Sequence, residues 1–62
     1  MNQQPFQDRL VKERERAHLT QISRSQCYKL SKQGKFPAPV RLSQRSIAWK
    51  LSELVAWIES RQ

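Results

Sequence analysis

Apolar residues near the C-terminus recur at the spacing of an amphipathic helix. They follow the pattern i, i+3, i+4, i+7, with one aromatic residue widening the stripe, and they are Leu51, Leu54, Val55, Ile58 and Trp57. Because a helix completes a turn in about 3.6 residues, these side chains share one face. The pattern predicts a helix over about residues 50–60 that buries this face.

Two short segments before that helix alternate between apolar and polar residues. They are residues 40–42 and 46–49, with Ser43, Gln44 and Arg45 between them. Alternation with a period of two is typical of strands, so we expect a β-hairpin with its turn at residues 43–45. Residues 36–39 contain two prolines, which fix φ and exclude a helix there.

Residues 24–32 contain neither glycine nor proline and are predicted to form another helix. Ser23 is a typical N-cap, since its hydroxyl oxygen can accept from the free amides of the first turn. Cys27 and Leu30 are three residues apart and share one face. Gly34 supplies the positive φ common at helix C-termini, so the helix should end at residues 33–34.

The N-terminal part of the chain has the weakest pattern. Residues 13–20 are good helix formers of mixed charge, but Ala17 and Leu19 give them only a thin apolar face. Residues 9–12 fit either a short strand or the lead-in to this helix. Residues 1–8 are expected to be a flexible arm before a single domain at residues 9–62, and Phe6 either packs back on that domain or stays free.

The two central helices have the spacing of a helix-turn-helix. Ala17 is small enough for a close helix crossing, Ile22 fills the turn, and Ser23 caps the second helix, whose inward residues are Cys27 and Leu30. The alternative is an ordinary helix pair with a solvated face. With the hairpin as a wing, we predict a mainly α-helical fold with a small β-hairpin, a winged helix-turn-helix.

The distribution of charge indicates a polyanionic partner. The 62 residues include 12 Lys and Arg but only 5 Asp and Glu, for a net charge of +7. Residues 16–52 contain no carboxylate, and their cations are Arg16, Arg24, Lys29, Lys32, Lys35, Arg41, Arg45 and Lys50. With no internal neutralisation, this block should attract the phosphate backbone of a nucleic acid.

Two other interpretations of the basic block concern solubility and membranes. A basic surface can simply keep a protein soluble. Binding to acidic lipid would place the cations on one helical face opposite Leu, Phe and Trp, whereas here they spread over helix, loop and hairpin. No apolar run approaches the roughly 18 residues of a spanning helix, and the start of the chain does not resemble a signal peptide. We expect a cytoplasmic protein without membrane contact.

The candidate DNA-binding residues lie on the second helix, in the segment after it and on the hairpin. Polar and cationic side chains at a helix start can bond base edges in a major groove, and a cationic hairpin tip can lie on the backbone or enter a minor groove. They are Arg24, Ser25, Gln26, Tyr28, Lys29, Lys32, Lys35, Arg41, Ser43, Gln44 and Arg45. Tyr28 either reaches a phosphate through its hydroxyl or rests its ring on the wing. For Gln44 and Arg45, the alternative is a plain solubilising turn.

Catalytic and metal chemistry are not expected. The chain is too short for a multidomain enzyme, and its Ser, His and Cys residues lack the spacing of a nucleophile with a base. With one cysteine, Cys27, and one histidine, His18, neither an internal disulfide nor a zinc quartet can form. We predict no cofactor, no metal and no small-molecule substrate, and we place Cys27, Trp49 and Trp57 in the core.

Four segments together resemble the AlpA family of small phage and prophage regulators, which are related to excisionases. They are Ser-Arg-Ser-Gln-Cys-Tyr-Lys-Leu at 23–30, Gly-Lys-Phe-Pro-Ala-Pro-Val-Arg-Leu at 34–42, Ser-Ile-Ala-Trp at 46–49 and Ser-Glu-Leu-Val-Ala-Trp-Ile at 52–58. The match spans about residues 9–61. Its most specific part is Gly-x-Phe-Pro-x-Pro-Val together with both tryptophans.

This resemblance implies a winged helix-turn-helix that binds double-stranded DNA. Such a protein either activates a recombinase gene or acts directly as a recombination directionality factor. Residues 24–32 would be the recognition helix and residues 43–45 the wing tip. A single module buries a small interface, so tight binding is expected to need several copies on repeated sites, with integrase as a further partner.

The chain departs from the family pattern at four positions. Gln21 and Ser43 stand where glycine is usual, which implies a tighter or strained turn at Gln21 and leaves the turn type of the wing open. Glu13 and Arg16 replace residues that are commonly apolar. We expect them to thin the core contacts of the first helix, with Arg16 as an additional candidate DNA contact.

A different class of function remains open beside DNA binding. The chain would then be a protein-interaction module whose basic face binds an acidic partner such as integrase or polymerase. RNA is less favoured, because no aromatic pair stands on an exposed strand face to stack bases.

Overall fold

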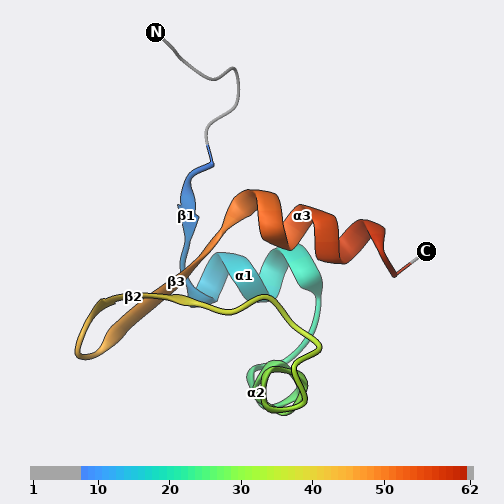
Figure 1. Ribbon diagram of the computed structural model, residues 1–62, viewed down its shortest axis with the longest axis horizontal. Helices are drawn as coiled ribbons and strands as arrows, with labels where there is room; N and C mark the ends of the chain where they lie inside the picture. The colour runs from blue at the N-terminus through green and yellow to red at the C-terminus, as the bar shows by residue number, and fades with distance from the viewer. Residues whose placement is uncertain (1–7, 62) are drawn as a thin grey trace, which may run out of the picture.

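A computed structural model describes residues 8–61, which form three helices and a three-stranded sheet (Figure 1). In chain order the elements are β1 (Leu10–Val11), α1 (Glu13–Thr20), α2 (Arg24–Lys32), β2 (Val40–Ser43), β3 (Ser46–Lys50) and α3 (Leu51–Glu59). The winged helix-turn-helix is confirmed, with α1 and α2 followed by the β2–β3 hairpin as the wing. Residues 1–7, which include most of the predicted arm and Phe6, lie outside the described residues.

The sheet contains one strand more than the hairpin. It is antiparallel with the order β1–β3–β2, so β3 is central. Leu10 pairs with Lys50 and Val11 pairs with Trp49. Of the two conformations left open for residues 9–12, the strand is therefore the one that forms, and it brings Val11 against the core.

The hairpin turn is one residue shorter than predicted. Ser43 pairs with Ser46 as the last residue of β2, which leaves Gln44 and Arg45 as the turn. The register shifts between Arg41 and Ser43, as it does at a β-bulge. Among the described non-glycine residues only Gln21 has a positive φ, so Ser43 needs no left-handed conformation at this place.

The turn between α1 and α2 is strained, as the missing glycine predicted. Gln21 ends α1 in the left-handed conformation, with φ 60° and ψ 27°. A residue with a Cβ is disfavoured there by contact with its own backbone. Two hydrogen bonds oppose that cost: the Gln21 N–H donates to the Ala17 carbonyl at 2.8 Å, and its side-chain amide donates to the His18 carbonyl at 2.6 Å.

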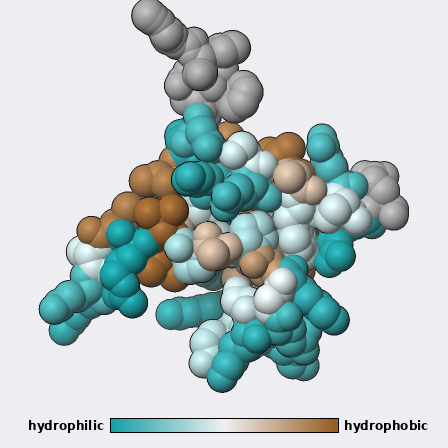
Figure 2. Space-filling view, in the orientation of Figure 1, coloured by the Kyte–Doolittle hydropathy of each residue, from teal (hydrophilic) through white to brown (hydrophobic). Residues whose placement is uncertain are grey.

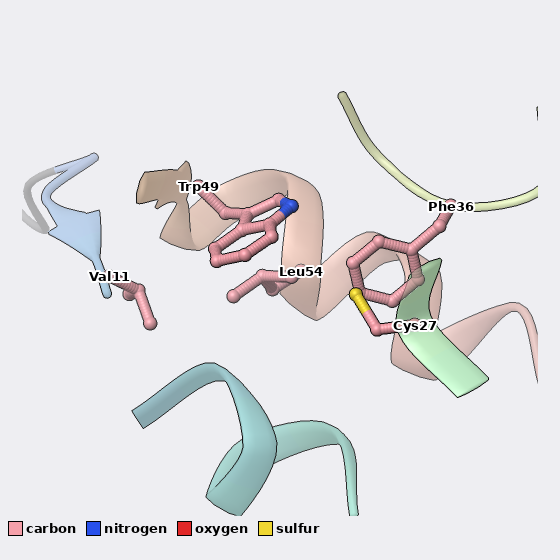
Figure 3. Packing of buried hydrophobic residues seen from close by; sticks show 5 residues of the cluster. All are labelled: Val11, Cys27, Phe36, Trp49 and Leu54. Carbon is pink, nitrogen blue, oxygen red and sulfur yellow. The ribbon is translucent and has the colours of Figure 1, made fainter. Parts of the chain in front are cut away.

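A small aromatic and aliphatic core joins the sheet to the helices. Figure 3 shows five buried residues of this cluster, namely Val11, Cys27, Phe36, Trp49 and Leu54. Phe36 meets both tryptophans edge to face, with ring centroids 6.4 Å from Trp49 and 4.9 Å from Trp57. Cys27 and Trp49 are buried as predicted, whereas Trp57 is only partly buried at the edge of this cluster.

Helix α3 buries a narrower stripe than predicted. Leu54 is fully buried, and Leu51, Trp57 and Ile58 are partly buried. Val55 is 42% exposed, so the prediction that it faces the core is wrong. Helix α3 packs mainly against α1 and β3, and Trp57 also contacts Phe36 in the segment after α2. These neighbours leave Val55 at the surface.

Asp8 caps α3 from outside the helix. The residue before α3, Lys50, provides no side-chain cap. Instead the Asp8 carboxylate accepts from the Ser52 N–H at 3.1 Å, and the Arg9 carbonyl accepts from the Leu51 N–H at 2.9 Å. The hydrogen bond from Ser52 holds the pKa of Asp8 below its usual value. The first described residues are thus tied to the positive end of the α3 dipole.

Candidate nucleic-acid interface

Helix α2 presents a row of polar and cationic side chains to solvent. Ser23 is its N-cap, as predicted, because the hydroxyl oxygen accepts from the Gln26 N–H at 3.1 Å. Cys27 is buried and Leu30 packs against the core, so the remaining sides of the helix stay outward. All the candidate residues on α2 are exposed, namely Arg24, Ser25, Gln26, Tyr28, Lys29 and Lys32.

A glycine turn and Trp57 fix the C-terminal end of α2. Gly34 has φ 72°, its N–H donates to the Ser31 carbonyl at 3.0 Å, and the Lys35 N–H donates to the Leu30 carbonyl at 2.9 Å. This pair of bonds is the Schellman motif, which favours glycine. The Trp57 indole N–H then donates to the Lys35 carbonyl at 2.9 Å. The backbone of the exposed candidate residue Lys35 is therefore fixed by this hydrogen bond from α3.

Tyr28 and Lys32 form a pair on the exposed surface of α2. Tyr28 is 65% exposed, and the Lys32 Nζ lies 5.4 Å from the centroid of its ring. An ammonium at that distance is attracted by the electron-rich ring face. The Tyr28 hydroxyl and the Lys32 ammonium are thereby presented side by side on one face of the helix.

The tip of the wing is polar and exposed. Its candidate residues Ser43, Gln44 and Arg45 all face solvent. The Arg41 guanidinium donates to the Ser43 carbonyl at 3.4 Å and to the Gln44 carbonyl at 3.2 Å. The Arg45 N–H donates to the Ser43 hydroxyl at 3.4 Å. Arg41 thus helps to shape the turn that carries Arg45.

Helix α2 and the wing contain no acidic residue of their own. Within residues 8–61 the ion pairs are Arg9 with Glu15, at 2.6 Å, and Arg16 with Glu13, and both engage α1. In Figure 2 the hydrophilic end of the wing, at left, and α2, at the bottom, project from the body of the molecule. The cations on these two projections therefore produce an uncompensated positive field.

Arg16 lies inside the protein, so the additional DNA contact expected from it is wrong. Its side chain is fully buried, and the guanidinium donates to the Glu13 carboxylate, to the Thr20 hydroxyl at 3.3 Å and to the Ile22 carbonyl at 2.8 Å. Its Cζ also lies 5.8 Å from the centroid of the Trp49 ring. Arg16 thereby joins α1 to the turn before α2, and Glu13 and Thr20, at helical spacing on either side, were the sequence signal for this.

A groove of about 870 Å³ separates α2 from the wing. Its apolar lining includes Cys27, Pro39, Ile47 and Trp49, and its remaining lining residues are Glu13, Ser23, Arg24, Ser25, Tyr28 and Ser31. Neither Ile47 nor Pro39 is among the residues that the sequence predicted for the interface. Ile47 lies two residues before Trp49 on the same strand, so the two side chains share one face of the sheet. This spacing could have indicated from the sequence that Ile47 contributes to the groove.

Three further observations concern metal ions, membranes and the cysteine. Among residues 8–61 no group of three or more His, Cys, Asp or Glu side chains is placed to hold a metal ion. No helix in the described segment is long and apolar enough to cross a membrane. Burial raises the pKa of the Cys27 thiol, which disfavours the reactive thiolate.

Comparison with known proteins gives two matches. Residues 9–62 match the model of a family described as prophage CP4-57 regulatory protein (AlpA). The chain is also 40% identical, over 55 residues, to an uncharacterized protein, ORF88, of Enterobacteria phage P4. The aligned region covers 89% of this chain and 62% of the phage protein, so the chain spans less than two thirds of that relative.

Proposed function

The chain belongs to the AlpA family of prophage regulatory proteins, and we propose that it regulates by sequence-specific binding to double-stranded DNA. The observation that carries this proposal is the exposed, cationic surface shared by α2 and the wing. Neither element contains an acidic residue, and the nearby Glu13 is paired with the buried Arg16. Regulation by DNA binding requires no catalytic group and no cofactor.

In this proposal α2 enters the major groove. Arg24 stands in the first turn, where its guanidinium can donate two hydrogen bonds to a guanine edge. Ser25 and Gln26 bond bases or phosphates. The phosphates along α2 are bound by Tyr28, Lys29, Lys32 and Lys35, which fix the register of the helix on the duplex.

The wing contacts the neighbouring part of the duplex. Ser43, Gln44 and Arg45 lie along the backbone or enter the minor groove, where a narrow groove concentrates negative potential around an arginine. Arg41 supports these contacts through its hydrogen bonds to the carbonyls of Ser43 and Gln44.

Two regulatory roles use the same contacts. The protein acts either as a transcriptional activator or as an excisionase, a recombination directionality factor of a phage or other mobile element. In both roles several copies bind repeated sites in the bacterial cytoplasm, and integrase is a further partner in the second. The roles differ in where the sites lie, so an experiment that maps the sites separates them.

The test is a pull-down of fragmented host and phage DNA with the purified protein, sequenced at two salt concentrations. We expect enrichment of short repeated sites that persists at the higher salt. Sites beside an attachment core indicate excision, and sites upstream of a promoter indicate activation.

Arg24→Ala serves as the matched control, because it should lose the enriched sites while it still retains bulk DNA. Absence of enrichment with the unaltered protein at either salt would contradict the proposal. It would favour an acidic protein as the partner of the basic surface.

A further inference from the structure

The groove between α2 and the wing combines an apolar floor with a cationic surrounding. Ile47 is 39% exposed there, beside Pro39 and the buried Trp49. Figure 2 shows the outline of the molecule indented between the wing and α2. A surface that binds only phosphates needs no exposed aliphatic side chain, so this floor fits a ligand with both an apolar and an anionic part.

The charges around the groove favour an anion. Arg24 lines the wall formed by α2, and Arg41 is the cross-strand partner of Ile47, which places both of their side chains on one face of the wing. The first turn of α2 contains no acidic residue. Glu13 is the carboxylate that lines the groove, and it is paired with Arg16.

The position of the groove determines which part of a duplex reaches it. If α2 lies in the major groove and the wing reaches the adjacent minor groove, one sugar–phosphate strand has to pass between them. That strand has anionic phosphates on its outside and apolar C–H groups on its deoxyribose rings. Its chemistry therefore matches both parts of the groove.

Resting on the proposed function, we infer that the groove is a binding site for this single sugar–phosphate strand. Deoxyribose rings pack on Ile47 and Pro39, and the flanking phosphates face Arg24 and Arg41. An acidic protein segment is the competing occupant. It is less favoured, because the groove lies between the two elements that engage DNA and would be filled whenever both are engaged.

Packing of a sugar in the groove and binding of a phosphate differ in how their contributions to affinity depend on salt. Phosphate neutralisation releases counterions, so removing such a contact flattens the dependence of log affinity on log salt. Packing a sugar on an aliphatic side chain releases no counterions and depends on buried apolar area. Loss of the Ile47 contact should therefore weaken binding equally at every salt concentration.

The experiment compares Ile47→Ala with Leu42→Ala on a duplex recovered by the genomic pull-down, titrated at several salt concentrations. Leu42 is an aliphatic residue of the wing with 46% exposure that does not line the groove, so it controls for a general effect on the wing. Thermal unfolding verifies that both variants are folded.

We expect Ile47→Ala to bind about five to ten times more weakly at each salt, the loss associated with a few methyl-sized groups. The slope of log affinity against log salt should stay that of the unaltered protein. Leu42→Ala should bind within about twofold of the unaltered protein, since it lies outside the groove.

Hydroxyl-radical footprinting locates the contact on the DNA, because the radical attacks deoxyribose. The unaltered protein should protect sugars of one strand between the α2 and wing contacts, and Ile47→Ala should lose that protection alone. Unchanged affinity and footprint for Ile47→Ala, an equal loss for Leu42→Ala, or a flatter salt slope would overturn the inference and leave the proposed function standing. Failure of the unaltered protein to bind the duplex would overturn both.

Discussion

Arg16 is a fully buried charged residue whose replacement should lower stability. A buried guanidinium is costly to remove from water, and it is tolerated when hydrogen bonds satisfy its donors. Here Glu13, Thr20 and the Ile22 carbonyl accept from it, and the Ile22 carbonyl belongs to the turn before α2. The same interactions that compensate for burial therefore help to set where α2 begins.

Replacing Arg16 by Met should lower the free energy of unfolding by about 1–3 kcal/mol, because the Thr20 hydroxyl and the Ile22 carbonyl lose their donor. Urea denaturation followed by tryptophan fluorescence measures this change. Arg14→Met is the matched control, since Arg14 is exposed on the same helix, and it should change stability by less than about 0.5 kcal/mol. Equal losses for the two variants would contradict the role given to Arg16.

Gln21 is a second residue with a testable energetic role. Gln21→Gly should raise the free energy of unfolding by up to about 1 kcal/mol, because it relieves the left-handed strain at the cost of one side-chain hydrogen bond. Gln33→Gly is the control, since Gln33 has an ordinary right-handed conformation after α2, and there glycine should destabilise by about 0.5–1 kcal/mol. Thermal unfolding compares the two, and destabilisation by Gln21→Gly would refute the argument from strain.

Among the elements, α2 is fixed mainly at its ends. The N-terminal end has the Ser23 cap and the Arg16 bond to Ile22, and the C-terminal end has the glycine turn and the Trp57 bond to Lys35. Its middle faces the groove on one side. The first and last turns of this helix therefore have a defined orientation.

The residues of α2 should divide into those that read sequence and those that bind phosphate. Arg24→Ala should reduce the ratio of specific to random binding about 10- to 100-fold, the loss of one bidentate base contact. Lys32→Ala should weaken both kinds of binding alike, because a phosphate contact carries no sequence information. Competition titrations with specific and random duplexes measure the ratio. If Arg24→Ala leaves it unchanged, α2 is not the reading element.

The cap of α3 by Asp8 should make stability depend on pH. The folded pKa of Asp8 lies below its ordinary value of 3.8. The ionised carboxylate therefore contributes stability above pH about 4, and this is lost as the pH falls through the lowered pKa. Asp8→Ala should lower the melting temperature at pH 7, and the difference should vanish in strong acid. Glu59→Ala, at the other end of α3, should show no such loss, and a pH-independent deficit for Asp8→Ala would argue against the carboxylate cap.

Elements defined by local chemistry were predictable, and those defined by distant contacts were not. Capping by Ser23 and the glycine turn at Gly34 are local, so the bounds of α2 followed from the sequence. The Asp8 cap joins residues 44 positions apart, and no local pattern reports it. The inward orientation of Arg16 and the exposure of Val55 likewise depend on which neighbours arrive in the folded chain.

In the candidate site, too, residues chosen for their local chemistry were predictable, and the groove formed by distant segments was not. Residues such as Arg24 and Arg45 were chosen for polar chemistry at predicted surface positions, and the structure places them at the surface. The groove was missed because it arises from the space between α2 and the wing. Its spacing from Trp49 places Ile47 on the inward face of the strand, but the groove itself forms only because α2 lies opposite that strand in the folded chain.

For the whole molecule, the main property is the separation of charge. The acidic residues of the described chain lie on α1, on α3 and at Asp8, while α2 and the wing carry cations without acids. A positive face of this kind attracts DNA of any sequence, and base contacts then select among sites. Affinity for random DNA and preference for a site are therefore separate quantities.

Binding to double-stranded DNA with sequence preference is the property from which the proposed regulation follows. The most direct measurement titrates the purified protein with a duplex recovered by pull-down and with a random duplex, over a range of salt concentrations. We expect saturable binding with a slope of log affinity against log salt of about −4.5 to −6.3, as for roughly five to seven neutralised phosphates. The preference for the recovered duplex should be about a thousandfold or more. Weak, unsaturable binding or equal affinity for both duplexes would contradict this expectation.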